Sequence, residues 1–220
     1  MIITRFAQSC ILIETAGKRI LVDPGTINYE ESLLKTHWKD IDAILVTHFH
    51  GDHCNDVAIN AMMKDPKTKL YSSAEVADKH PDINVDIKEA GESIKVGDIK
   101  IEVVEAHHGY IPWLKGGKLP KENVGYIIDD GTTIIYITSD TICFENDFKC
   151  DVLVAPITDC GVTMGAFEVA LYAQELSAKL TIPVHYHNPK FEVDLDKAKA
   201  IFDKEGIKYK FMDVKESIEL

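Results

Sequence analysis

Short runs of β-branched and apolar residues recur along the chain, separated by glycine or polar turns. This pattern is typical of β-strands joined by tight connections. The apolar run over residues 41–47 predicts a mostly buried strand. In all, the pattern predicts strands at residues 2–6, 10–14, 18–22, 41–47, 70–72, 94–96, 99–104, 124–128, 133–138, 152–155, 180–184 and 207–212.

Helical periodicity appears between these strands. Residues 165–179 carry apolar side chains at helical spacing, Phe167 and Leu171 among them, which predicts an amphipathic helix. Asn55 is suited to cap a helix that runs to about residue 64. Two further helices are expected at residues 73–79 and 195–204. Strands interrupted by helices predict an α/β fold with sheet in the middle and helices outside.

The composition is that of an ordinary globular protein, with 45% apolar and 27% charged residues in a chain of 220. Neither an internal repeat nor a linker divides it, so we expect one domain over residues 1–220. No apolar run approaches the roughly 18 residues that a membrane-spanning helix needs. The first residues do not combine a basic segment with an apolar core, so we expect no signal peptide and a cytoplasmic protein.

The net charge restricts the binding partners that we expect, and the cysteine content indicates the redox state of the cellular compartment. The formal net charge of −12 argues against general nucleic-acid binding, which needs a basic face to neutralise phosphates. A small-molecule substrate is the expected partner, and the sequence leaves open whether the protein forms a homo-oligomer. The five cysteines are an odd number without a C-x-x-C pair, which indicates free thiols in a reducing compartment.

The most informative segment is Thr-His-Phe-His-Gly-Asp-His at residues 47–53. It places four candidate ligands within six residues: His48, His50, Asp52 and His53. Imidazole and carboxylate groups are ligands of zinc, manganese and iron. Four ligands are more than one tetrahedral ion needs if a substrate position stays open. The spacing therefore favours two metal ions.

Other candidate ligands follow predicted strands in the same way. His107 and His108 come after the strand at 99–104, Asp140 after the next hairpin, and His185 after the strand at 180–184. A single histidine at a strand end is more often structural, but here four strands are each followed by His or Asp. Ligand sites of α/β sheets gather at the carboxyl ends of strands. We therefore expect one shared metal site.

These motifs resemble the metallo-β-lactamase superfamily of binuclear metallohydrolases. The matching residues begin with Leu-Val-Asp-Pro at 21–24 and continue through H-x-H-x-D-H, the His107–His108 pair and Ser139-Asp140 to Pro-Val-His at 183–185. Thr-His-Phe-His-Gly-Asp-His, Ala-His-His-Gly, Thr-Met-Gly at 163–165 and Ile-Pro-Val-His-Tyr are similar to a branch of metal-dependent hydrolases related to ascorbate-phosphate lactonase and the N-acylethanolamine-producing phospholipase D. The resemblance implies an αββα sandwich with the metal site at the C-terminal ends of the strands.

The resemblance also implies a ligand set. His48, His50 and one of His107 and His108 would hold the first ion, Asp52, His53 and His185 the second, and Asp140 would bridge both. We favour His108 because the branch has its ligand directly before a small residue, and Gly109 follows here. The resemblance makes Asp23 a structural acid that supports the ligand loop by hydrogen bonding. Ser139 departs from the glycine that many relatives have before the bridging Asp.

Two divalent transition-metal ions would follow, with zinc expected first and manganese or iron accepting the same ligands. Two cations about 3.5–4 Å apart lower the pKa of a shared water towards 7. The resulting metal-bridging hydroxide would attack a carbonyl or phosphoryl centre. We expect Asp52 to act catalytically, by orienting this hydroxide and relaying a proton.

The substrate site is less sharply marked. Residues 110–121 form a long loop directly after His108, and its Tyr110 and Trp113 either line the site as a wall or lid or pack into the core or a subunit interface. His187, two residues beyond a candidate ligand, either binds substrate or lies on the surface. For Cys54, next to His53, burial is the expectation.

The function we expect is hydrolysis of an ester, lactone or amide bond in a small substrate. One alternative is a phosphodiesterase acting on a small or single-stranded substrate, with which lysines on the 110–121 loop are compatible. Another is a non-catalytic metal- or partner-binding protein, because a fold by itself does not dictate function.

Overall fold

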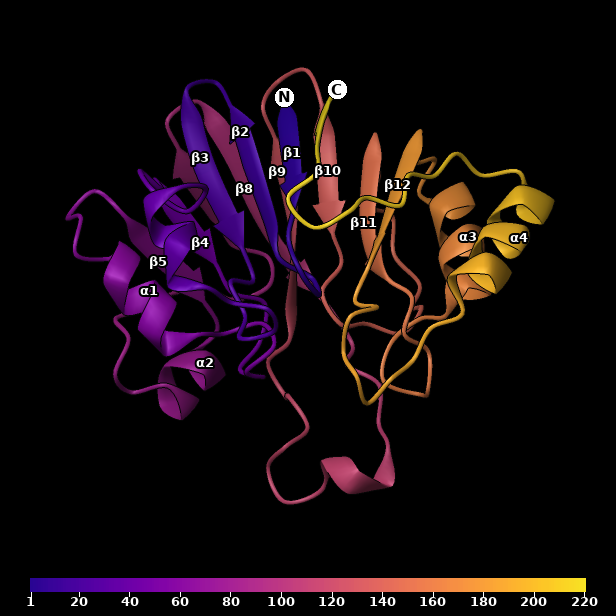
Figure 1. Ribbon diagram of the computed structural model, residues 1–220, viewed down its shortest axis with the longest axis horizontal. Helices are drawn as coiled ribbons and strands as arrows, with labels where there is room; N and C mark the ends of the chain where they lie inside the picture. Colours follow the sequence, from indigo (N-terminus) through magenta and orange to yellow (C-terminus); the bar gives the residue numbers. More distant parts are fainter.

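The computed structural model describes residues 1–220 and consists of two β-sheets packed face to face, with helices on the outer face of each (Figure 1). The predicted α/β class and the αββα sandwich are confirmed. Most predicted strands are present, with ends that differ by one or two residues.

The first sheet has seven strands and combines residues up to 87 with the C-terminal end of the chain. Its first three strands in the chain pair antiparallel, and the next three extend the sheet in parallel. In spatial order the strands are β13 (Ser217–Glu219), β1 (Ile2–Arg5), β2 (Ile11–Thr15), β3 (Lys18–Val22), β4 (Ala43–Leu45), β5 (Lys69–Ser72) and β6 (Asp86–Ile87).

The second sheet has six strands. In spatial order these are β12 (Leu180–Val184), β11 (Val152–Pro156), β10 (Ile134–Ile137), β9 (Val124–Asp129), β8 (Ile99–Glu105) and β7 (Ser93–Val96). The strands from β7 to β10 are antiparallel, whereas β10, β11 and β12 run parallel. Gly97, at φ 62°, lies in the turn between β7 and β8.

A cluster of 22 buried apolar residues fills the space between the sheets. Alternation along the strands produces it: Ile135 and Ile137 of β10 enter this cluster, whereas Tyr136 points to the outer layer. The outer layers consist of η1 (Glu31–Lys35), α1 (Asp56–Met62) and α2 (Ala74–Lys79) on the first sheet, and α3 (Ala166–Glu175) and α4 (Leu195–Glu205) on the second (Figure 1). None of these helices combines the length and the apolar character needed to cross a membrane.

Helix ends follow local hydrogen bonding. The Asn55 side chain accepts a hydrogen bond from Ala58 N at 3.2 Å, so the predicted cap of α1 is present. The prediction for α3 was wrong at its C-terminal end, since the helix ends at Glu175 rather than at 179. Lys179 N and Leu180 N both donate to Asp151 O, which draws this part of the chain into β12 instead.

The prediction of a strand at residues 207–212 was wrong. Only one isolated bridge, between Tyr209 and Thr181, joins this segment to β12. Its aromatic rings pack on Phe202 of α4 instead, and Met212 enters the central core. The last strand is β13, which pairs antiparallel with β1. Its three residues, like the two exposed residues of β6, are too few for a hydrophobic pattern.

Candidate metal centre

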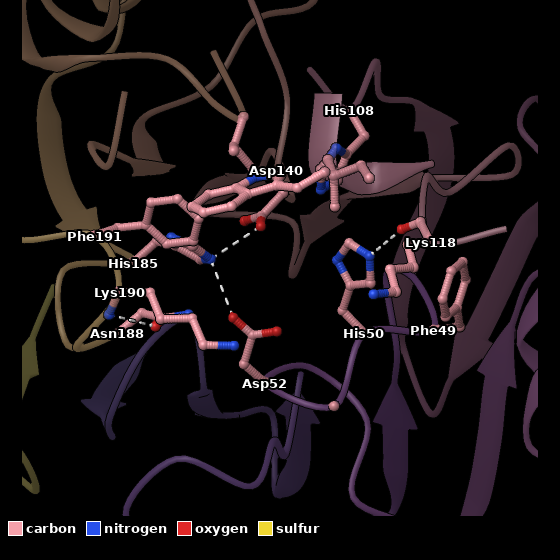
Figure 2. Close-up of a pocket in the computed structure, with 14 residues that line it drawn as sticks. Phe49, His50, Asp52, His108, Lys118, Asp140, His185, Asn188, Lys190 and Phe191 are labelled. Atoms are coloured by element: carbon pink, nitrogen blue, oxygen red, sulfur yellow. Dashed lines mark hydrogen bonds and ion pairs between the residues drawn. The ribbon is translucent and has the colours of Figure 1, made fainter. Parts of the chain in front are cut away.

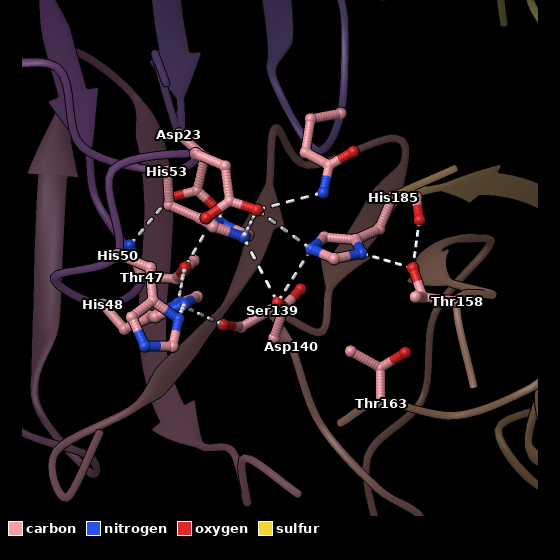
Figure 3. A network of polar contacts seen from close by, with 12 residues as sticks. Asp23, Thr47, His48, His50, His53, Ser139, Asp140, Thr158, Thr163 and His185 are labelled. Atoms are coloured by element: carbon pink, nitrogen blue, oxygen red, sulfur yellow. Dashed lines mark hydrogen bonds and ion pairs between the residues drawn. The ribbon is translucent and has the colours of Figure 1, made fainter. Parts of the chain in front are cut away.

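Side chains from four strand ends meet at one edge of the sandwich (Figures 2 and 3). They follow β4, β8, β10 and β12, as the sequence predicts. Their ligand atoms form three overlapping groups, with the atoms of each group within 4.8 Å of one another. The groups are His48, His50 and His108; His48, His53 and Asp140; and Asp52, His53 and His185.

Asp23, at the end of β3, holds the ligand loop that follows β4. Its carboxylate is fully buried and accepts hydrogen bonds from Thr47 N at 2.8 Å and from Thr47 Oγ1 at 2.9 Å. The same carboxylate lies 2.7 Å from His53 Nδ1 and accepts a hydrogen bond from this nitrogen as well (Figure 3). Because Nδ1 of His53 is engaged, Nε2 faces the cluster, which is how a carboxylate orients a metal-binding imidazole.

Backbone acceptors orient two more imidazoles. His50 Nε2 lies 2.6 Å from Lys118 O, and His108 Nδ1 lies 2.7 Å from Gly109 O. A carbonyl oxygen only accepts, so these nitrogens carry the protons. The remaining nitrogens, His50 Nδ1 and His108 Nε2, are then free to bind a cation. His50 Nδ1 faces His48 Nε2 at 3.0 Å.

Asp140 lies at the centre of the cluster. Its Oδ2 is 2.9 Å from His185 Nε2 and 3.3 Å from His53 Nε2 (Figure 3). Asn123 holds the backbone here, since its Nδ2 donates to Asp140 O at 2.8 Å and its Oδ1 accepts from Ser139 Oγ at 2.6 Å. Ser139 thus has a structural partner of its own.

The structure brings His108, and not His107, to the cluster. The His107 side chain is exposed, lies 3.6 Å from Glu105, and packs its ring against Phe144. Close approach explains the small residue after His108, because a Cβ atom on Gly109 would lie 2.1 Å from Gly161 O. Cys54 is buried, as expected.

Four buried atoms of this cluster have no hydrogen-bond partner: His53 Nε2, His108 Nε2, His185 Nε2 and Asp140 Oδ1. A single unsatisfied buried polar atom costs about 1–3 kcal/mol. Four such atoms within one set of overlapping ligand groups would be satisfied by cations bound among them, and imidazole and carboxylate are suitable donors. The residues therefore fit divalent metal ions.

The charge state of the cluster also suits cations. Burial raises the pKa of the Asp140 carboxyl, but His185 and His53 outweigh burial and hold this pKa well below its usual range. Asp52 behaves likewise: burial raises its pKa, but His185, whose Nε2 lies 3.4 Å from Asp52 Oδ2, and His53 lower this pKa by more than burial raises it. Burial lowers the pKa of His185, but Asp140 and Asp52 raise it to about 9. Both carboxylates are thus ionised at neutral pH.

A pocket of about 440 Å³ opens in front of the cluster (Figure 2). Its lining combines candidate ligands with residues of two loops: Phe49, His50, Gly51, Asp52, His108, Trp113, Leu114, Lys118, Asp140, Val162, His185, Asn188, Lys190 and Phe191. Trp113, which belongs to the short helix η2 (Pro112–Leu114), therefore lies where one interpretation of the loop expected it. Tyr110 is exposed and does not line the pocket.

His187 does not line the pocket either. Its Nδ1 lies 2.7 Å from Arg5 Nη2 and its backbone N donates to Gln8 Oε1 at 3.2 Å. Burial, together with the Arg5 charge, lowers the pKa of His187 to about 4. The neutral imidazole accepts from the guanidinium, so His187 ties the segment after β12 to β1.

Sequence reasoning missed two kinds of residue. Gln8, in the turn after β1, donates to Asp52 Oδ2 at 3.0 Å, and no motif marks it. Asn188, Lys190 and Phe191 line the pocket from the segment after β12. Their only signal is that they follow His185 within six residues.

Comparison with known proteins identifies the family of this chain. The sequence profile of a family described as beta-lactamase superfamily domain matches residues 2–185. A UPF0173 metal-dependent hydrolase of Listeria welshimeri is 31% identical over 100% of both chains, and one of Nanoarchaeum equitans is 28% identical over 100% of both.

Solved structures show the same fold. Igni18, a metallo hydrolase from Ignicoccus hospitalis, superposes with a TM-score of 0.79 at 23% identity and covers 99% of this chain and 97% of its own. An isothiocyanate hydrolase from Delia radicum gut bacteria gives a TM-score of 0.78 at 18% identity, covering 100% and 99%. With its motifs, its sandwich and these relatives, the chain belongs to the metallo-β-lactamase superfamily, among its metal-dependent hydrolases.

Proposed function

We propose that this protein is a binuclear metal-dependent hydrolase that cleaves an ester, lactone or amide bond in a small substrate. The observation that carries the proposal is the overlap of the ligand groups. One three-histidine group and one group of Asp52, His53 and His185 lie side by side, and Asp140 forms a third group with a histidine from each. A single ion would leave several of these donors without a role.

In this assignment each ion has three ligands of its own. His48, His50 and His108 would hold one ion, Asp52, His53 and His185 the other, and Asp140 would contact both. The unpartnered Oδ1 of Asp140 supports the bridging role, since its Oδ2 already faces His185 and His53. Mixed imidazole and carboxylate donors favour zinc, while manganese and iron accept the same set.

Bound divalent ions would lower the pKa of a water between them and polarise the bond to be cleaved. The protein's own contribution comes mainly from Asp52, which lines the pocket. Its Oδ2 receives a hydrogen bond from Gln8, and its pKa lies below the usual range, so the carboxylate is ionised at neutral pH. We therefore assign Asp52 the proton-relay role.

The pocket supports a small substrate. Its volume of about 440 Å³ lies within the range of about 300–1,000 Å³ typical of small-molecule sites. Loops from both sheets contribute candidate ligands, which supports one domain spanning residues 1–220. All candidate ligand positions hold competent donors, which favours a catalyst over a non-catalytic binding protein.

The test begins with metal content, measured by elemental mass spectrometry on protein purified without chelator. We expect about two ions per chain and hydrolysis of p-nitrophenyl esters that chelator abolishes and added zinc restores. Asp140→Asn should lower both metal content and activity. The matched control is Asp147→Asn, which changes an exposed aspartate in the same connection.

Three outcomes would contradict the proposal. One ion per chain at full activity would remove the binuclear site. No metal uptake on reconstitution would favour the non-catalytic alternative. Hydrolysis of bis(p-nitrophenyl) phosphate, without any turnover of esters, lactones or amides, would favour the phosphodiesterase.

A further inference from the structure

Two loops form the rim of the pocket, residues 110–121 after β8 and residues 188–191 after β12. They meet through Trp113 and Phe191, whose ring centroids lie 5.7 Å apart at an interplanar angle of 81°. This edge-to-face contact closes an apolar wall above the ligand cluster. The Trp113 side chain nevertheless stays 61% exposed, so apolar surface remains free for a ligand.

Two lysines on this rim also line the pocket, Lys118 from the first loop and Lys190 from the second. Neither ammonium group takes part in any ion pair or hydrogen bond of the structure. Figure 2 shows the Lys190 side chain extending towards Asp52 and the Lys118 side chain beside His50. The only acidic residues of the lining are Asp52 and Asp140, which belong to the ligand cluster. In a protein of net charge −12 the rim is thus locally positive.

Hydrogen bonds fix the backbone at both lysines. Lys118 O accepts the proton of His50 Nε2 at 2.6 Å, which ties the first loop to a candidate ligand. In the second loop, Lys190 N donates to Asn188 Oδ1 at 3.0 Å and Phe191 N donates to Asn188 O at 3.0 Å. The backbone of both lysines is therefore held by hydrogen bonds, while their ammonium groups are unpaired.

We propose that the substrate carries an anionic group next to an apolar body, and that Lys118 and Lys190 bind the anion while Trp113 and Phe191 contact the apolar part. The inference rests on the proposed function, since it takes the bond to be cleaved to lie at the metal centre below the rim. Carboxylate and phosphate monoester groups share the required charge. The lysines are specificity-determining residues and take no part in bond cleavage.

The kinetic test compares two esters of the same leaving group on the metal-loaded protein: p-nitrophenyl glutarate, which carries a free carboxylate, and the uncharged p-nitrophenyl valerate. We expect kcat/KM to be higher for the charged ester. Lys118→Met and Lys190→Met should each lower the charged-to-uncharged ratio about fivefold, as expected for exposed charge pairs, and the double variant should abolish the preference. Salt should weaken it in the wild type.

Lys115→Met is the matched control, because Lys115 belongs to the same loop but does not line the pocket. It should leave the ratio unchanged. A double variant that keeps the wild-type ratio would overturn the proposal, and so would equal losses for both esters.

Direct binding tests the rim even if neither ester is cleaved, an outcome that would count against the proposed function alone. The chain has two tryptophans, of which Trp38 is buried and Trp113 exposed, so tryptophan fluorescence reports on the rim. We would titrate the metal-loaded protein with 3-phenylpropionate, phenyl phosphate and the uncharged 3-phenylpropanamide, with Trp113→Phe to assign the signal.

The anions should bind at lower concentrations than the amide, and the lysine double variant should weaken their binding about tenfold, the product of two fivefold losses being an upper limit. The tighter of the two anions identifies the anionic group. Equal binding of the amide and both anions would refute the inference. Anion binding that is undiminished in the double variant would do the same, because the metal centre alone would then account for it.

Discussion

At the scale of single residues, the candidate ligands depend on buried partners that select one nitrogen of each imidazole. Asp23 is the clearest case, because one carboxylate accepts from Thr47 twice and from His53 once. The expectation that Asp23 supports the ligand loop by hydrogen bonds agrees with this geometry. The resemblance favoured His108 over His107, but the residues alone did not decide between them, since the choice depends on which of them turns towards the histidines after β4.

Asp23→Asn should weaken metal binding about 10–100-fold, the usual effect of removing a partner that orients a ligand. The amide of Asn cannot accept from all three donors that Asp23 satisfies. Competition with a chromogenic chelator measures the affinity. Asp98→Asn, an exposed change in the β7–β8 turn, is the control and should have no effect. An unchanged affinity in Asp23→Asn would show that His53 does not need this partner.

At the scale of elements, the sequence predicted strands more accurately than the segments that depend on packing between distant parts of the chain. The apolar runs of β3 and β12 match their predicted limits because alternation and turn residues are local. The helix α3 ends early because the backbone N–H groups that follow it, at residues 179 and 180, donate to the carbonyl oxygen of Asp151 on another segment. The segment 207–212 looked like a strand because its apolar residues are spaced for burial, but they pack on a helix.

The contact between the loops after β8 and β11 yields a prediction at this scale. Gly109→Ala would place a Cβ 2.1 Å from Gly161 O and 2.6 Å from Val162 O, both backbone atoms that cannot rotate away. We expect a loss of about 1–3 kcal/mol in the free energy of unfolding, as for other overpacked sites, together with weaker metal binding at His108. Urea unfolding measures the first and chelator competition the second.

Gly51→Ala is the matched control for stability, because the added Cβ would meet nothing closer than 3.9 Å. It should unfold at the wild-type urea concentration. If Gly109→Ala did so too, the two loops would be able to separate without cost, and the small residue after His108 would need another explanation.

At the scale of the whole molecule, the site exists only because both sheets bring strand ends to one edge. Removing the metal should therefore make stability depend on pH. The pKa of His185 is raised to about 9 by Asp140 and Asp52 in spite of burial, from about 6.5 in an unfolded chain. Because the folded protein holds the His185 proton more tightly than the unfolded chain does, this proton stabilises the fold. The stabilisation is complete below pH 6.5 and is lost as the pH rises through about 9.

The melting temperature of chelator-treated protein should accordingly fall as the pH rises from 6.5 to about 9. The metal-loaded protein should not follow this fall, because bound cations replace the protons on the imidazoles. The stabilisation by metal should thus grow with pH, as measured by calorimetry of both forms. His185→Gln should make the profile of the metal-free protein less steep, while His53, whose pKa Asp140 and Asp23 also raise, keeps part of the slope. A metal-free melting temperature that rises over this interval would contradict the assignment.

The sequence by itself determined the fold class, most strands and the set of candidate ligands, because hydrophobic period, turn residues and the H-x-H-x-D-H spacing are local properties. Only the tertiary structure decided which of His107 and His108 joins the cluster, that Gln8 holds Asp52, and that two distant loops form one rim with unpaired lysines. These features arise where segments far apart in the chain pack together. Local patterns of residues do not specify which distant segments come into contact.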